Sequence, residues 1–233
     1  LDIRARAVLP RLLEIIKEKP ATEAEKMGFE ELRTWDFEAR AARIAPTIFR
    51  EYWLELNRLT WEDEKSGDLT RMPRPASQVM ADLVLNSPDA PYFDDRTTPE
   101  RESLPVIAER AFRAAVPNLE KLLGPFSESW KWGKVKGTSL EHLAGIPGFG
   151  LEKLEADGVG HAIDAIDEGW APSWRMVVEL GPEVKAWGNY PGGQSGNPGS
   201  KYYKDRVEDW AAGRSYELVF LKSADEPDPR IVG

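Results

Sequence analysis

The sequence contains no cysteine and only two histidines among its 233 residues. The lack of cysteine excludes disulfide bonds, thiolate metal sites and a cysteine nucleophile. It does not indicate a compartment, because an exported protein of this size is stable without disulfides. The sequence also has no run of about 18 apolar residues, so it predicts no membrane-spanning helix.

Basic residues are in the minority and are not clustered. The 31 Lys and Arg are outnumbered by 40 Asp and Glu, which gives a formal net charge of −9. Phosphate binding needs clustered Lys and Arg, so we expect no nucleic-acid surface. Acidic and basic residues are interspersed along the first half of the chain, a pattern that favours solubility over ligand binding.

A secretory signal and an initiator methionine are both missing from the start of the sequence. Residues 1–20 form a charged amphipathic pattern without a cleavage site. Leu1 stands at the first position. We therefore expect that further sequence precedes it.

The first region, residues 1–125, is predicted to be helical. Apolar residues near a 3.6-residue period predict a first helix that ends before Pro20. Thr22 and Glu25 form a capping-box pattern at the start of a second helix. Pro46 lies inside the apolar stripe of a third helix, where we expect either a kink or the helix start.

Two loops and two further helices are predicted in the rest of this region. Residues 61–75 are polar and contain proline, so we expect a loop there. A short helix is expected over residues 76–86, followed by a second proline-rich loop. The last helix is predicted to begin at Pro99, with acidic residues in its first turn, and to end at about Leu123.

The second region, residues 126–233, is rich in glycine and is predicted to contain short strands. We expect these strands at residues 134–136, 162–166, 174–180, 184–190 and 216–221. The run at 174–180 has a continuous apolar centre, which is typical of a strand covered on both faces. A helix is expected over residues 201–212. The fold class is therefore predicted as α+β, with helices first and strands last.

The predicted strands do not form a convincing sheet by themselves. Short strands with long connections leave exposed edges. The helices in turn have apolar stripes without an obvious continuous partner. We therefore expect the strands to complete a sheet formed by preceding sequence, so that regions 1–125 and 126–233 are parts of one larger domain.

Several motifs of the chain occur in the same order in one known family. Residues 171–180, APSWRMVVEL, are close to its GPSWRMVVDL motif, and residues 191–200, PGGQSGNPGS, match its Gly-rich loop. Weaker matches are Leu32, Trp35, Asp36, Ile48, Phe49 and Trp53. Further matches are Trp130, residues 132–135, His142, residues 145–148, Tyr202, Tyr203, Trp210 and Gly213. The chain thus resembles the penicillin acylase (penicillin amidase) family, most strongly over residues 130–222.

The resemblance implies an N-terminal-nucleophile hydrolase with stacked αββα sheets. Such a precursor cuts itself into two chains, and the new N-terminal Ser of the second chain is both nucleophile and base. An Asn side chain and backbone N–H groups form the oxyanion hole. These groups, an active-site Arg and the calcium-binding acids are implied to precede this chain. The resemblance therefore implies no catalytic, cofactor-binding or metal-binding residue here, and a structural calcium only in the assembled enzyme.

Ser195 lies in the Gly-rich loop 191–200, where a nucleophile could stand. The motif G-x-S-x-G would need glycine at position 197, but the chain has Asn197. A phosphate-binding loop is excluded because Ser200 separates the last glycine from Lys201. A structural loop serine is favoured. The alternative is that this loop borders the active-site cleft of the assembled enzyme.

The other polar candidates also favour structural roles. His142 and His161 have no further metal ligands nearby in the sequence. The acidic clusters are Asp164, Asp167 and Glu168, and Asp94 with Asp95. The second cluster lacks the ligand register of a calcium loop. Most of the nine tryptophans lie at element junctions or in apolar stripes, where packing is favoured over a ligand surface.

Arg175 is the most unusual charge, because it lies inside an apolar strand pattern. A buried arginine needs acceptors, so we expect a carboxylate or several carbonyl groups around it.

The resemblance implies a function for the assembled protein: hydrolysis of a linear amide between an acyl group and an amine. Candidate substrates include β-lactam side chains and acyl-homoserine lactones. The implied partners are the rest of the precursor, namely the α chain and the N-terminal part of the β chain. A periplasmic or secreted location is also implied. The alternatives are a stand-alone, non-catalytic binding module derived from the family, or a small enzyme that uses Ser195.

Overall fold

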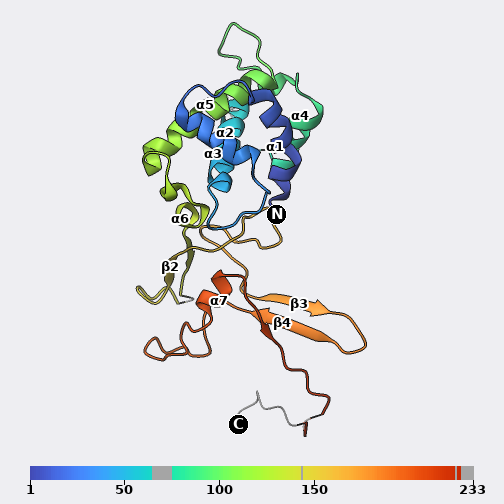
Figure 1. The fold of residues 1–233 in the computed structure, drawn as a ribbon, viewed down its shortest axis with the longest axis vertical. Coiled ribbons are helices and arrows are strands. Elements are labelled where there is room, and N and C mark those ends of the chain that lie inside the picture. Colours follow the sequence, from blue (N-terminus) through green and yellow to red (C-terminus); the bar gives the residue numbers. More distant parts are fainter. Residues whose placement is uncertain (65–74, 143, 224, 227–233) are drawn as a thin grey trace.

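The computed structural model describes residues 1–64, 75–142, 144–223 and 225–226. Helices gather at one end of the molecule and the strands lie at the other (Figure 1). The N-terminus lies near the junction between the two parts. The chain is thus α+β in the order that the composition indicates.

The helical part contains all the longer helices of the described residues. They are α1 (Ile3–Ile16), α2 (Glu23–Arg33), α3 (Ala45–Trp61), α4 (Ser77–Asn86) and α5 (Leu104–Leu123). Shorter elements are η2 (Pro91–Phe93), η3 (Glu128–Trp130) and α6 (Trp132–Lys136). Helix α3 packs along α5, α1 and α2 pack against this pair, and α4 packs on α1.

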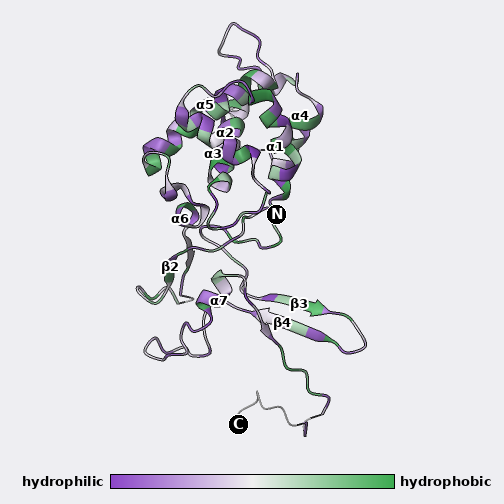
Figure 2. Ribbon diagram, viewed as in Figure 1, coloured by the Kyte–Doolittle hydropathy of each residue, from purple (hydrophilic) through white to green (hydrophobic). Residues whose placement is uncertain are grey.

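One continuous apolar core joins these helices. Hydrophobic residues recur along each helix among hydrophilic ones (Figure 2). Tyr52 of α3 meets Phe112 of α5 edge to face, with ring centroids 5.5 Å apart, and Ile48 and Val116 are fully buried beside them. The expectation that the helical stripes lack a partner is therefore wrong, because the stripes of α1 to α5 face one another.

The predicted helix starts are confirmed at α2 and α3. The Oγ1 of Thr22 accepts from the backbone N–H of Glu25 at 3.1 Å, and the Glu25 carboxylate accepts from the N–H of Thr22 at the same distance. This is the capping box. Pro46 lies in the first turn of α3, so it begins the helix and does not kink it.

The sequence predicts that helix α5 begins at Pro99, but the helix begins at Leu104. The buried Glu102 explains the later start. Its N–H donates to Asp94 at 2.9 Å, and its carboxylate accepts from the N–H of Asp95 at 3.0 Å. These bonds fold residues 94–102 into a loop, because the backbone of Glu102 is already committed to Asp94. The predicted end of α5 is confirmed at Gly124, which has φ +82°.

The β part contains two small antiparallel sheets. Strand β1 (Thr138–Leu140) pairs with β2 (Leu151–Leu154). Strands β3 (Arg175–Glu179), β4 (Lys185–Asn189) and β5 (Tyr216–Glu217) form the second sheet in the order β3-β4-β5. Val177 lies opposite Trp187 in this register. A short helix, α7 (Val207–Ala211), precedes β5.

Several predicted β-region elements differ from the structure. Residues 134–136 belong to helix α6, and residues 162–166 form turns in which the N–H of Val159 donates to the carbonyl of Asp164. The helix predicted over 201–212 is confined to Val207–Ala211, because the N–H of Arg206 instead donates to Gly192. The last strand spans only Tyr216–Glu217. The structure of these short glycine-rich segments is determined by tertiary contacts, which their local sequence pattern does not predict.

The pattern of strand β3 is typical of a strand covered on both faces, but the described chain covers neither face. Met176 and Val177 point to opposite faces, yet their relative exposures are 54% and 64%. Strand β3 is also an edge strand, paired only with β4. Within the described residues, its apolar side chains are therefore largely uncovered.

Candidate functional site

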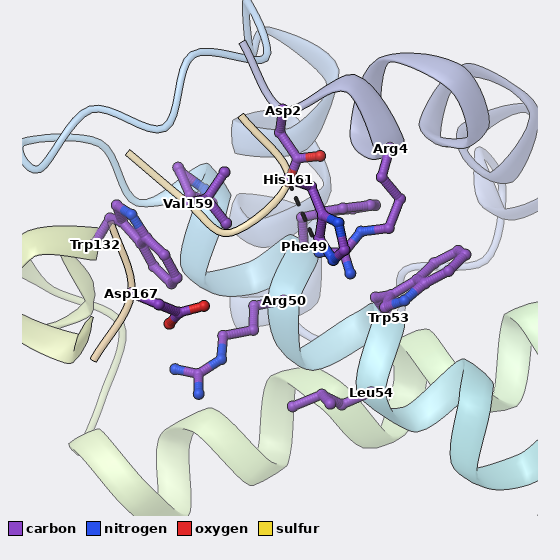
Figure 3. Close-up of a pocket in the computed structure, with 11 residues that line it drawn as sticks. Asp2, Arg4, Phe49, Arg50, Trp53, Leu54, Trp132, Val159, His161 and Asp167 are labelled. Atoms are coloured by element: carbon purple, nitrogen blue, oxygen red, sulfur yellow. Dashed lines mark ion pairs between the residues drawn. The ribbon is translucent and has the colours of Figure 1, made fainter. Parts of the chain in front are cut away.

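A pocket of about 130 Å³ lies where the helical part meets the segment that follows β2. It is bounded by the first turn of α1, by α3, by the start of α6 and by residues 159–167 (Figure 3). Its lining residues are Asp2, Arg4, Pro46, Phe49, Arg50, Trp53, Leu54, Trp132, Val159, His161 and Asp167. We call this the arginine pocket.

Backbone bonds around Asp2 fix one wall of the arginine pocket. The Asp2 carboxylate caps α1 by accepting from the N–H of Ala5 at 2.9 Å. The N–H of Asp2 donates to Phe37 at 2.7 Å, and the N–H of Ile3 donates to the carbonyl of His161 at 3.3 Å. The start of α1 is thus joined both to the loop before α3 and to the wall that carries His161.

Arg4 reaches into the pocket across two aromatic rings of α3. Its guanidinium carbon lies 5.4 Å from the ring centroid of Phe49 and 5.1 Å from that of Trp53. The side chain is only 14% exposed, and its one ion pair is with Asp2 at 3.8 Å. Its Nε is buried without a hydrogen-bond acceptor among the described residues. Burial lowers the pKa of Arg4, and Asp2 and Asp167 oppose this effect.

Arg50 projects from α3 toward the same pocket. Its guanidinium lies 5.9 Å from the ring of Trp132, and its nearest carboxylate within the described chain is Glu168 at 4.0 Å. The side chain is 40% exposed. Figure 3 shows Arg50 beside Asp167 and Trp132, on the opposite side of the pocket from Trp53. The pocket therefore combines two guanidinium groups with aromatic walls.

His161 lines the pocket next to Arg4. Burial lowers the pKa of its imidazole, the positive charge of Arg4 lowers it further, and Asp2 and Asp167 act in the opposite direction. The imidazole is therefore neutral near pH 7. No described group of three His, Cys, Asp or Glu residues could hold a metal ion.

Lys136 holds the backbone next to the lining residue Val159, a role that the sequence did not reveal. Its Nζ donates to the carbonyls of Asp157 at 3.0 Å and Gly158 at 3.2 Å, and lies 5.6 Å from the ring of Trp132. Burial lowers its pKa to about 8. Trp132 and Lys136 are four residues apart, which is the spacing of one helix face. The sequence pattern instead predicts a strand at residues 134–136.

The Gly-rich loop 191–200 lines a second pocket, of about 200 Å³. Ser195 and His142 both line it, although they are distant in sequence. The Oγ of Ser195 accepts from the N–H of Asn197 at 3.1 Å, and Nδ1 of His142 accepts from the N–H of Ala144 at 3.2 Å. No hydrogen bond joins Ser195 to His142 in the described chain. A serine nucleophile needs a base within hydrogen-bond reach, so the geometry favours a structural loop.

Arg175 has the acceptors that its sequence position predicts. Its Nη1 lies 3.2 Å from Oδ1 of Asp164, and its Nη2 donates to the backbone carbonyl of Trp210. The guanidinium also stacks on the Trp210 ring at 4.9 Å. The expectation for Arg175 is confirmed, and Asp164 is its carboxylate partner.

The remaining acidic candidates do not form one site. Asp94 and Asp95 bond to the loop around Glu102, as described for α5. Asp167 accepts from the N–H of Glu168 at 2.9 Å and faces the arginine pocket. Sequence reasoning missed Arg4 and Arg50, because neither lies in a motif and only the tertiary fold brings them together.

The chain is similar in sequence to proteins of one known family. The sequence model of the penicillin amidase family matches residues 1–226. The chain belongs to the penicillin amidase family. Acyl-homoserine lactone acylase QuiP of Pseudomonas syringae pv. tomato is 36% identical over 148 residues, covering 58% of this chain and 18% of that protein. QuiP of Pseudomonas putida is 26% identical over 228 residues, covering 89% of this chain and 28% of that protein.

A solved structure of thermostable penicillin G acylase from Alcaligenes faecalis has a similar fold. The match has a TM-score of 0.53 at 16% identity and covers 98% of this chain and 47% of that chain. The chain spans about a fifth of the length of the first curated relatives that it matches. In the part that the structure describes, none of the helices combines the length and apolarity needed to cross a membrane.

Proposed function

We propose that this chain is the C-terminal part of the β chain of an N-terminal-nucleophile amide hydrolase. The match of the family model to residues 1–226 carries this proposal. The assembled protein hydrolyses a linear amide between an acyl group and an amine. The names of the curated relatives favour acyl-homoserine lactones over β-lactam side chains as the substrate.

The chemistry belongs to the remaining portions of the precursor. An N-terminal Ser, exposed by self-cleavage, attacks the amide carbonyl, and its own α-amino group accepts the proton. An oxyanion hole stabilises the tetrahedral intermediate. In this account, regions 1–125 and 126–233 are structural parts of one larger domain. A structural calcium of the assembled enzyme would lie outside this segment, and the location would be periplasmic or secreted.

The uncovered strand β3 supports a structural role in a larger sheet. In the described chain, the edge of β3 that does not face β4 has no strand partner. Met176 and Val177 expose apolar surface on both faces. An exposed apolar edge strand of this kind tends to pair with other chains and to aggregate in water. We infer that the preceding portions of the precursor cover these faces and that the strands complete an αββα stack.

The test is expression of the complete gene with Val177 replaced by Asp. We expect the precursor parts to fail to assemble and the release of homoserine lactone from an N-acyl substrate to fall at least 100-fold, because the charge would be buried. Leu122→Asp is the matched control, since Leu122 is exposed on α5. Full activity and full assembly of Val177→Asp would contradict the role of β3.

The second candidate is a stand-alone, non-catalytic binding module derived from the family. The continuous core of α1 to α5 favours it, because the helical part buries its apolar stripes without help. The two candidates differ in hydrogen exchange. A stand-alone module keeps the amides of β3 protected in the isolated chain, whereas a fragment of a larger sheet protects them only in the assembled protein.

A further inference from the structure

The two guanidinium groups of the arginine pocket are poorly supplied with acceptors. An arginine carries five N–H donors in a fixed fork. In the described chain, Arg4 has one ion pair, with Asp2 at 3.8 Å, and its buried Nε has no acceptor. Arg50 has one, with Glu168 at 4.0 Å. Both distances exceed that of a charged hydrogen bond, about 2.8 Å.

The carboxylates of the pocket act on Arg4 only from a distance, and each also has another partner. Asp2 caps α1 through the N–H of Ala5. Asp167 accepts from the N–H of Glu168, and its charge acts on the buried ammonium of Lys136. His161 adds no negative charge in either protonation state. Among the described residues, the guanidinium groups of Arg4 and Arg50 therefore keep N–H donors without a close acceptor, the buried Nε of Arg4 above all.

Most of the rest of the lining is apolar. Phe49 and Trp53 hold the guanidinium of Arg4 against α3, and Leu54, Val159 and Trp132 complete the walls. Pockets of this composition, with a few convergent polar groups on apolar walls, are typical of small-molecule sites. A volume of about 130 Å³ suits a molecule the size of one aromatic ring with a carboxyl group.

We propose that the arginine pocket binds a small organic carboxylate, which places its carboxyl group between Arg4 and Arg50 and its apolar body against Trp53 and Leu54. The planar guanidinium fork matches a carboxylate in two parallel hydrogen bonds. The site is built by α1, α3 and residues 159–167, and it does not depend on the proposed hydrolase chemistry.

The test uses the complete, processed protein and titration calorimetry with benzoate. Benzamide is the neutral control of the same shape, and we expect it to bind at least ten-fold more weakly than benzoate. Arg50→Gln should weaken benzoate binding at least ten-fold, and Leu54→Glu should do the same by adding a carboxylate at the rim. Arg113→Gln on α5 is the matched control, since Arg113 is similarly exposed and lies outside the pocket. Unchanged melting temperatures would show that the variants fold.

The position is tested by diffraction from crystals of the processed protein with 4-bromobenzoate, using the anomalous signal of bromine. A bromine peak beside Trp53 and Leu54 supports the proposal, because the bromine of 4-bromobenzoate lies opposite its carboxyl group. The proposal is overturned if benzoate does not bind, if Arg50→Gln and Leu54→Glu bind it as the wild type does, or if the bromine lies only elsewhere. It is also overturned if a side chain from another part of the processed protein accepts hydrogen bonds from both guanidinium groups.

Discussion

The guanidinium of Arg175 lies over the ring of Trp210, 4.9 Å from its centroid, while its Nη1 contacts Asp164 at 3.2 Å. Arg175 opens β3, Trp210 belongs to α7, and Asp164 follows β2. One side chain therefore connects three segments, two of which also share the small apolar cluster of Ile166 and Trp210. The packing of the β part therefore uses this connection in addition to its short strands.

Replacing Arg175 with Met should loosen the β part. The change leaves the Asp164 carboxylate without its donor and the carbonyl of Trp210 with only the N–H of Gly213 among the described residues. We expect a loss of about 2 kcal/mol in local stability, because partly buried ion pairs are costly to break. Faster hydrogen exchange in β3 and α7 of the processed protein would show this. Arg214→Met is the control, since its ion pair with Asp209 is more exposed. Equal exchange rates in both variants would contradict the role of Arg175.

Lys136 should make stability rise at alkaline pH. Burial lowers its pKa to about 8 in the folded protein, from a usual value of about 10.4 in an unfolded chain. Between these values the unfolded state binds more protons, so the free energy of unfolding increases with pH. Relative to Lys136→Met, the wild type should gain about 2 kcal/mol between pH 8 and pH 10.

This gain is measured by denaturant unfolding of both proteins across that pH range. Lys134→Met is the matched control, because Lys134 is exposed two residues earlier on the same helix. It should retain the pH dependence of the wild type. If the free energies of unfolding of the wild type and Lys136→Met changed with pH in the same way, the lowered pKa of Lys136 would be contradicted.

Gly193 should tolerate no side chain. A Cβ at this position would lie 1.9 Å from the backbone oxygen of Tyr202 and 2.5 Å from the carboxylate of Asp205. We expect Gly193→Ala to cost about 2 kcal/mol or more, because backbone must move to admit the methyl group. Gly196→Ala, three residues later, meets no atom within 4 Å. Thermal unfolding should separate the two variants, and equal melting temperatures would show that the loop is not packed as described.

The sequence predicted those features that depend on local chemistry. The capping box of Thr22 and Glu25, the helix start at Pro46 and the helix end at Gly124 each follow from a few neighbouring residues. The partners of Arg175 could also be predicted in kind, because a guanidinium in an apolar strand requires acceptors wherever they come from.

The features that could not be predicted depend on contacts between distant segments. Residues 134–136 form a helix whose Lys136 reaches the carbonyls of residues 157 and 158, more than twenty positions later. The arginine pocket likewise joins Arg4, Arg50 and Asp167 from three separate segments. No periodicity or motif records such contacts, so local patterns identified neither the turns at 162–166 nor the pocket.

The central claim is that this chain works as part of a larger amide hydrolase with a separate nucleophile. Native mass spectrometry of the protein purified from its complete gene, with sequencing of each chain's N-terminus, tests it most directly. The account predicts two chains that remain bound, with this sequence inside the chain that begins with Ser, and loss of amide hydrolysis when that Ser is replaced by Ala. A lone polypeptide of 26.2 kDa with this sequence would contradict it.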